Sequence, residues 1–154
     1  MMWQQLIEDL EKLCTAYDEL AKLGEKQRDA LVAVNIKELS KILEQEKAIF
    51  SNIQNLDKRR KELLQELSED TPAENFYETA PTVEMTAKLK QIHKQLSENV
   101  ERALKLRDHN QILAQTALDN VTFKLNQLGG AFVEPTYGAK GSIVTHQKKF
   151  DYHA

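Results

Sequence analysis

Apolar side chains recur at alternating steps of four and three residues along most of this chain. This spacing keeps one face of a helix turned toward a partner helix. The first block of this stripe comprises Leu6, Leu10, Leu13, Tyr17, Leu20, Gly24, Gln27, Leu31 and Val34. The second block comprises Leu39, Ile42, Glu46, Ile49, Ile53, Leu56, Arg60, Leu63 and Leu67. The pattern predicts an all-α fold whose long helices offer surface to other helices, and it favours a binding protein over an enzyme.

The overall composition limits the partners of such a protein. The chain has 154 residues, enough for one domain, and its 29% charged and 41% hydrophobic residues suit a folded helical protein. The net charge of -3 gives no general attraction to nucleic acid or anionic lipid. No apolar run approaches the roughly 20 residues of a membrane span, and the first residues lack the basic segment of a signal peptide. We therefore expect a cytoplasmic protein.

Two of the predicted helices are joined by a very short connection. The first is expected over residues 3–33 and the second over residues 36–67. Asn35 stands where a helix N-cap is needed, since its side chain can accept a hydrogen bond from a backbone N–H of the first turn. A connection this short forces the two helices into an antiparallel hairpin.

A loop and a longer third helix follow the hairpin. Residues 68–81 contain two prolines and four acids without a helical period, so they are expected to be a loop. Phe76 and Tyr77 either anchor this loop on the bundle or lie exposed; the sequence leaves both open. The third helix is expected over residues 82–128, with Gly129 and Gly130 as its stop. Its stripe comprises Leu89, Ile92, Leu96, Val100, Ala103, Ala114, Ala117, Val121 and Leu128.

The third helix is predicted to outlast the hairpin. At 1.5 Å per residue the first two helices are each about 47 Å long, whereas the third reaches about 69 Å. Because the third helix starts at the open end of the hairpin, its excess length falls in roughly residues 115–128. An apolar helix end without a partner in its own chain is an interaction or dimer site. A bent third helix that folds back is the alternative.

Polar and off-stripe residues of the third helix add two expectations. Arg107 and Asn110 interrupt the stripe, which is typical of a polar layer that sets the register of packed helices. Ile112 and Phe123 share one direction on the side opposite the stripe, which adds modestly to the case for a partner surface.

The remaining residues, 129–154, are expected to form a flexible Gly-rich and aromatic tail outside the helical bundle of residues 1–128. Four of the five glycines lie there.

The sequence shows no constellation typical of catalysis or metal binding. The four histidines have no metal-ligand spacing with one another, with Cys14 or with paired carboxylates. Cys14 is the single cysteine, which excludes an internal disulfide, and a buried thiol is expected. The basic cluster at residues 58–61 is flanked by glutamates, so a solvated helix face is favoured over a phosphate site. We expect no enzyme activity, no metal and no cofactor.

Three segments together resemble the FlgN family of flagellar export chaperones. The first is the acidic, Leu-rich pattern LIEDLEKLCTAYDELAKLGEKQRDALVAVNIKELSKILEQEKAIF. The second is Asn110-Gln-Ile-Leu113 in the long third helix, and the third is Tyr137-Gly138-Ala139-Lys140-Gly141 shortly after it. The tail element is the most specific of the three.

This resemblance implies a cytoplasmic chaperone of flagellar type III secretion. Such proteins bind the C-terminal segments of the hook-associated proteins FlgK and FlgL, prevent premature assembly and deliver these clients to the export gate. By this analogy the end of the third helix binds the client, with Leu118, Val121, Leu125 and Leu128 as anchors. Phe132 and Tyr137 then cover the groove when it is empty.

Two other functions remain open at this point. A structural coiled-coil protein without a client explains the stripe equally well, and its free helix end would be buried in a homodimer. A transcriptional regulator or other adaptor that uses the basic cluster at residues 58–61 is the third alternative.

Overall fold

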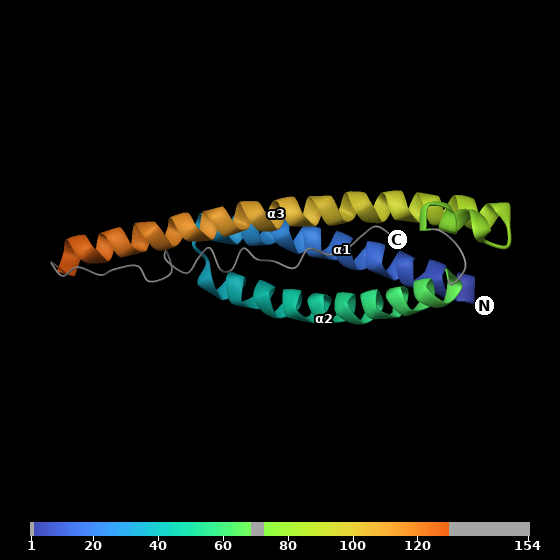
Figure 1. Ribbon diagram of the computed structural model, residues 1–154. Coiled ribbons are helices and arrows are strands. Elements are labelled where there is room, and N and C mark those ends of the chain that lie inside the picture. The colour runs from blue at the N-terminus through green and yellow to red at the C-terminus, as the bar shows by residue number, and fades with distance from the viewer. Residues whose placement is uncertain (1, 69–72, 130–154) are drawn as a thin grey trace.

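The computed structural model describes residues 2–68 and 73–129, and within them the fold is all-α. Helix α1 (Met2–Ala33) and helix α2 (Ile36–Leu67) form an antiparallel hairpin, and helix α3 (Val83–Gly129) lies along it (Figure 1). The predicted fold class, a hairpin with a long third helix, is confirmed. A short 3-10 helix, η1 (Ala73–Thr79), lies in the segment expected to be a loop. Residues 130–154, with Phe132 and Tyr137, lie outside the described residues.

The turn between α1 and α2 uses one capping side chain and one unusual backbone conformation. The Asn35 side chain accepts a hydrogen bond of 3.1 Å from the backbone N–H of Glu38, as its N-cap position predicts. The Asn35 N–H donates back to the Ala30 carbonyl over 2.9 Å. Val34 between the helices has φ 53°, a left-handed conformation that a β-branched residue rarely adopts. The chain thus reverses direction within two residues.

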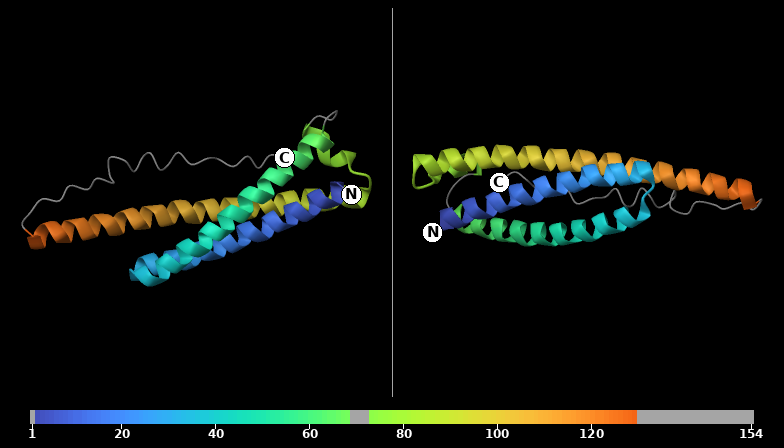
Figure 2. Two further views of the ribbon diagram at one scale, coloured as in Figure 1. Left: turned by 90° about the horizontal axis from the view of Figure 1, so that it is seen from below. Right: turned by 180° about the vertical axis from the view of Figure 1, so that it is seen from behind.

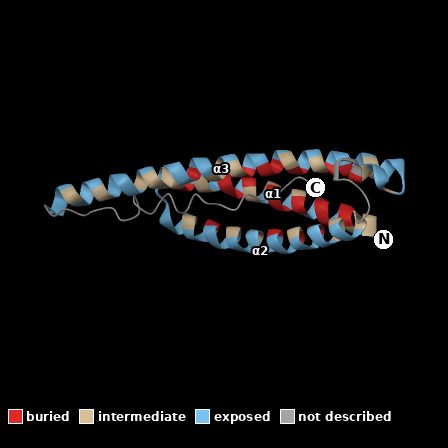
Figure 3. Ribbon diagram, viewed as in Figure 1, coloured by how far each residue is buried: buried red, intermediate tan, exposed pale blue. Residues whose placement is uncertain are grey.

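Helix α1 lies between the other two helices (Figure 1). It packs against both α2 and α3, whereas the described backbones of α2 and α3 do not approach each other closely. Figure 3 shows the consequence: buried residues recur along α1, while the outer sides of α2 and α3 are exposed. The buried core includes Leu6, Ile7, Leu10, Leu13, Tyr17, Ile53, Leu56, Leu89, Leu96 and Val100.

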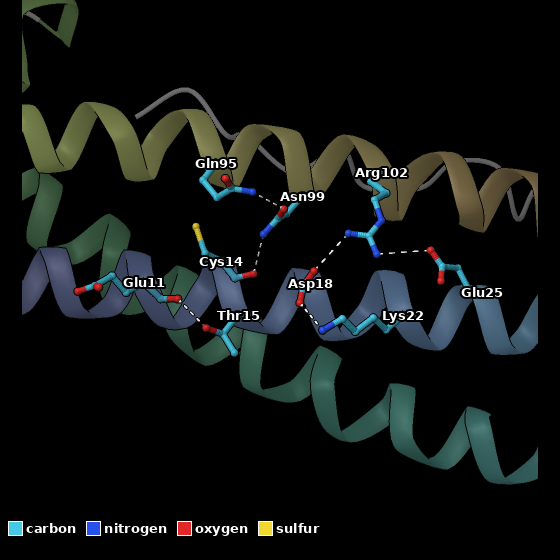
Figure 4. A network of polar contacts seen from close by, with 9 residues as sticks. All are labelled: Glu11, Cys14, Thr15, Asp18, Lys22, Glu25, Gln95, Asn99 and Arg102. Atoms are coloured by element: carbon cyan, nitrogen blue, oxygen red, sulfur yellow. Dashed lines mark hydrogen bonds and ion pairs between the residues drawn. The ribbon is translucent and has the colours of Figure 1, made fainter.

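Polar contacts fix α3 in a parallel register along α1 (Figure 4). The Asn99 side-chain amide donates to the Cys14 carbonyl over 3.0 Å, and Gln95 donates to Asn99 over 2.9 Å. Arg102 forms ion pairs with Asp18 at 3.2 Å and with Glu25 at 3.5 Å. These ion pairs involve exposed groups and contribute little stability.

Further along α3, the register depends on a close approach at Gly24. The Asn110 side-chain amide donates to the Gly24 carbonyl over 2.8 Å. A Cβ at Gly24 would lie 3.2 Å from the Cβ of Leu106, so a side chain here forces its neighbour to move. The glycine within the stripe therefore lets α3 approach α1 closely.

Helix η1 closes the end of the bundle that contains the start of α1. Phe76 is buried and stacks on Trp3 with ring centroids 5.0 Å apart. The Tyr77 hydroxyl lies 3.1 Å from Nδ1 of His93 on α3, and burial raises the pKa of this tyrosine. Of the two possibilities left open by the sequence, the structure shows that both aromatic residues anchor this segment.

Candidate functional site

Helix α3 continues past the end of the hairpin, as the helix lengths predict (Figure 2). Asn99 bonds to a residue 85 positions earlier in α1, and Asn110 to one 86 positions earlier. The same offset places the last residue of α1, Ala33, level with residues 118 and 119. We call residues 118–129, about 18 Å of helix, the overhang. Because α3 is one helix to Gly129, the bent alternative is not observed.

The apolar stripe of α3 continues onto the overhang without its partner. At 100° per residue, Leu118, Val121, Leu125 and Leu128 extend the face that Leu89 and other core residues bury against α1. Their exposed fractions are nevertheless large, from 49% at Leu118 to 86% at Leu128. Figure 3 shows the change from buried to exposed along the same helix. The four expected anchors therefore form a continuous exposed stripe.

Ile112 and Phe123, two further residues predicted to bind a partner, lie away from this stripe. Ile112 and Phe123 are exposed on the opposite side of α3, as their spacing predicts. One ligand helix lying on the stripe cannot contact both sides of α3.

A hollow of about 350 Å³ lies where the overhang leaves the hairpin. We call it the corner hollow. Of the predicted anchors that the structure describes, Val121 lines it. Its lining comprises Leu31, Val32, Val34, Leu113, Thr116, Ala117, Asn120, Val121 and Lys124. The contribution of Val32 and Val34, both exposed at the hairpin turn, was not anticipated from the sequence.

Two further hollows lie along α1 next to the corner hollow, and we call these two together the α1 groove. Helix α1 supplies the floor of this α1 groove, α2 supplies one wall through Glu46 and Phe50, and α3 supplies the other. Leu31 lines both this groove and the corner hollow, so the two adjoin at this residue. The floor residues are Tyr17, Leu20, Gly24, Gln27 and Leu31, and the α3 wall comprises Ala103, Leu104, Arg107, Asn110, Gln111 and Ala114.

Polar members of all three stripes meet in the α1 groove. Gln27, Glu46, Arg107 and Asn110 line one hollow of about 270 Å³, and we call these four residues the polar layer. Asn110 is only 4% exposed, and its amide also donates to the Gln27 side-chain oxygen over 3.2 Å. Its Oδ1 is buried and receives no hydrogen bond from the described residues. The sequence predicted this interruption of the α3 stripe, but not its junction with the other two helices.

Two half-buried side chains, Glu46 and Cys14, have pKa values above their usual range. Burial raises the pKa of the Glu46 carboxyl, and no ion pair to it is formed within the described part of the chain. Burial, with a smaller contribution from Glu11, raises the pKa of the Cys14 thiol to about 11. Its Sγ contacts the Ile92 carbonyl at 3.6 Å. Cys14 is thus half-buried rather than fully buried as expected, and its raised pKa makes it a weakly reactive packing residue.

The basic cluster at residues 58–61 is engaged in ion pairs rather than presented as a free patch. Arg59 reaches the fully buried carboxylate of Asp9 at 3.2 Å. Arg60 is itself buried and pairs with Asp57 at 2.7 Å, and Lys61 reaches the same carboxylate at 3.2 Å. Lys58, Arg59 and Lys61 are exposed, as a solvated helix face predicts, and only Arg60 is buried. The internal pairs argue against a phosphate-binding role.

Neither a metal cluster nor a membrane span is found in the described ranges. No three His, Cys, Asp or Glu side chains among residues 2–68 and 73–129 are placed to hold a metal ion. No helix within these ranges is both long and apolar enough to cross a lipid bilayer.

Comparison with known proteins gives one match. The family model described as FlgN protein matches residues 1–145, which is nearly the whole chain. Neither the curated proteins nor the solved structures that were searched contain a significant match.

Proposed function

Because the chain belongs to the FlgN family of flagellar export chaperones, we propose that its clients are the hook-associated proteins FlgK and FlgL. In this proposal the chaperone binds the C-terminal helical segments of its clients in the cytoplasm. It prevents their premature assembly and delivers them to the gate of the flagellar type III export apparatus. Its role is binding, with no catalytic step and no cofactor.

The observation that supports this proposal most is the exposed stripe of the overhang. Leu118, Val121, Leu125 and Leu128 continue a face that is buried elsewhere on α3, yet all four are about half exposed or more. Only Val121 among them shares a hollow with the end of α1. An amphipathic client helix laid on this stripe replaces the missing helix and buries the same kind of surface. The overhang therefore accounts for client binding by the packing that already holds α1 and α3 together.

The expected energetics suit a chaperone that must release its client. A segment that becomes helical on binding loses conformational entropy, which offsets part of the free energy gained by burying the anchors. The complex is therefore reversible. In the same proposal Phe132 and Tyr137, which lie outside the described residues, cover the stripe when no client is bound.

The test is a titration of the chain with the C-terminal segment of FlgK from the same organism. We expect saturable one-to-one binding by calorimetry, with a gain in helicity by circular dichroism beyond the sum of the parts. The variant Leu118→Ser/Leu125→Ser should weaken this binding by at least about tenfold, because it removes two apolar anchors. Leu43→Ser is the matched control, since Leu43 on α2 is as exposed as Leu125 but lies away from the overhang.

Each outcome of this titration is informative. Loss of binding in the overhang variant alone, with unchanged helicity of the empty chain, supports the proposed site. Equal affinities for the overhang variant and the Leu43→Ser control would reject the overhang as the client site. No binding of the FlgK or FlgL segments to the unmodified chain would reject these clients.

A structural homodimer is a second candidate that the same exposed stripe favours. Two overhangs can bury their stripes against each other as an alternative to binding a client helix. Light scattering separates the two functions. A mass that stays at one chain over a wide concentration range excludes the dimer, whereas a stable dimer that does not bind FlgK favours it.

A further inference from the structure

The α1 groove offers a second surface, distinct from the overhang, with its own chemistry. Between Ala103 and Lys124 on α3 the groove and the corner hollow extend about 32 Å, enough for a ligand helix of about 21 residues. Most of the surface is apolar, with Phe50 as an exposed aromatic side chain on the α2 wall. Such a groove accommodates the apolar face of an amphipathic helix.

Two hydrogen-bond acceptors of the polar layer lack donors in the described part of the chain. The Glu46 carboxylate is half-buried and forms no ion pair with the described residues, although Arg107 lines the same hollow. The buried Asn110 Oδ1 likewise receives no hydrogen bond there. A buried acceptor without a donor is costly, and partial burial also disfavours the charged form of the Glu46 carboxyl. Both costs fall if a ligand supplies a positively charged donor.

The other charged group at this position is compatible with such a ligand. Arg107 is half-buried, and a long arginine side chain can turn its guanidinium toward water while its stem stays packed. The side-chain amide of Asn110 already donates through Nδ2 to the Gly24 carbonyl and to the Gln27 side-chain oxygen, so both of its donors are in use. What remains unsatisfied in the polar layer is acceptor capacity.

We propose that the α1 groove binds an amphipathic helix with one Lys or Arg on its apolar face, and that Glu46 selects this basic residue. The inference rests on the proposed function for its kind of partner, a helical protein segment. It goes beyond it by assigning a second surface and a specificity residue. The basic residue sits at the level of Arg107, three helical turns before the level of Leu118.

Designed peptides test this selectivity without depending on the identity of the client. Three helical peptides of about 21 residues share one apolar face and differ at its central position, which is Lys, Glu or norleucine. We expect the Lys peptide to bind at least about tenfold more tightly than the other two by fluorescence anisotropy, since close partly buried charge pairs contribute this much. Glu46→Gln should remove the preference, whereas Glu44→Gln, an exposed control two residues away, should retain it.

A stability measurement on the empty chain provides an independent check. Because the half-buried Glu46 carboxyl forms no ion pair with the described residues, Glu46→Gln should raise the midpoint of urea unfolding while it weakens binding of the Lys peptide. A lower midpoint would mean that Glu46 already has an internal partner, which would overturn the proposal. Equal affinities for the three peptides, no binding of any of them, or a preference for the Glu peptide would also overturn it. If the unmodified chain does not bind the FlgK segment but still prefers the Lys peptide, only the assignment of FlgK as a client is rejected.

Discussion

The two halves of α3 carry the same stripe in different surroundings. Up to Asn110 the stripe packs against α1, and residues such as Leu89 are fully buried. Beyond the end of α1 the same face continues through Val121 and Leu125, yet these side chains are about half exposed. The difference lies in the length of the partner helix rather than in the sequence of α3 itself. A stripe therefore predicts that a face can pack, while the partner decides whether it does.

The largest effect expected from this comparison is in stability. Leu89→Ala should lower the free energy of unfolding by about 2–5 kcal/mol, because it removes buried methyl groups and leaves a cavity. Leu125→Ala, the same change in the overhang, should cost less than about 0.5 kcal/mol. Urea unfolding followed by circular dichroism measures both. Similar losses in the two variants would mean that the overhang is buried against another part of the chain or a second copy.

The rate of thiol alkylation compares the packed part of the bundle, where Cys14 of α1 faces α3, with the overhang. With its pKa raised from 9.0 to about 11, Cys14 should react with iodoacetamide at about pH 8 roughly a hundredfold more slowly than in the urea-unfolded chain. Val121→Cys in a Cys14→Ser background should react at nearly the unfolded rate. Because the folded state holds the Cys14 proton more strongly, the stability due to this thiol falls as the pH rises from 9 toward 11. Mass spectrometry of the alkylated chain gives the rates, and a fast-reacting Cys14 would contradict its burial.

Paired asparagine variants compare polar groups in the two halves. Asn110→Ala should lower the free energy of unfolding by about 1–2 kcal/mol, since it removes the hydrogen bonds to Gly24 and Gln27. Asn120→Ala, at an exposed position in the overhang, should change it by less than about 0.5 kcal/mol. Thermal unfolding of both variants beside the unmodified chain tests this. An unchanged Asn110→Ala variant would show that the polar layer does not hold α3 in register.

The smallest effect is expected where α1 ends. Val34→Gly should raise the free energy of unfolding by up to about 1 kcal/mol, because glycine adopts the left-handed conformation without strain. Val32→Gly, in the last turn of α1, should lower it by about 1 kcal/mol instead. Opposite signs in urea unfolding support the strained turn. If Val34→Gly also weakens FlgK binding, the strained valine is retained for the surface that it presents.

Much of the fold could be predicted from sequence because its signals are local. The four-three spacing determined which face of each helix packs, and Asn35 determined where α2 begins. The relative lengths of the stripes predicted an overhang with exposed Leu118, Val121, Leu125 and Leu128. By contrast, nothing local distinguished a buried Phe76 from an exposed one, because its burial depends on stacking with Trp3, which lies 73 positions earlier in the chain.

The sequence by itself determined that polar residues interrupt the stripes, at Gln27, Glu46, Arg107 and Asn110. Only the tertiary structure decided that these four interruptions lie around one hollow. The reason is geometric: helical spacing fixes the direction of a side chain about its own axis, whereas the relative shift of neighbouring helices depends on long-range packing. In this protein Gly24 and two asparagines set that shift, and it brings the polar layer together while leaving the overhang unpaired.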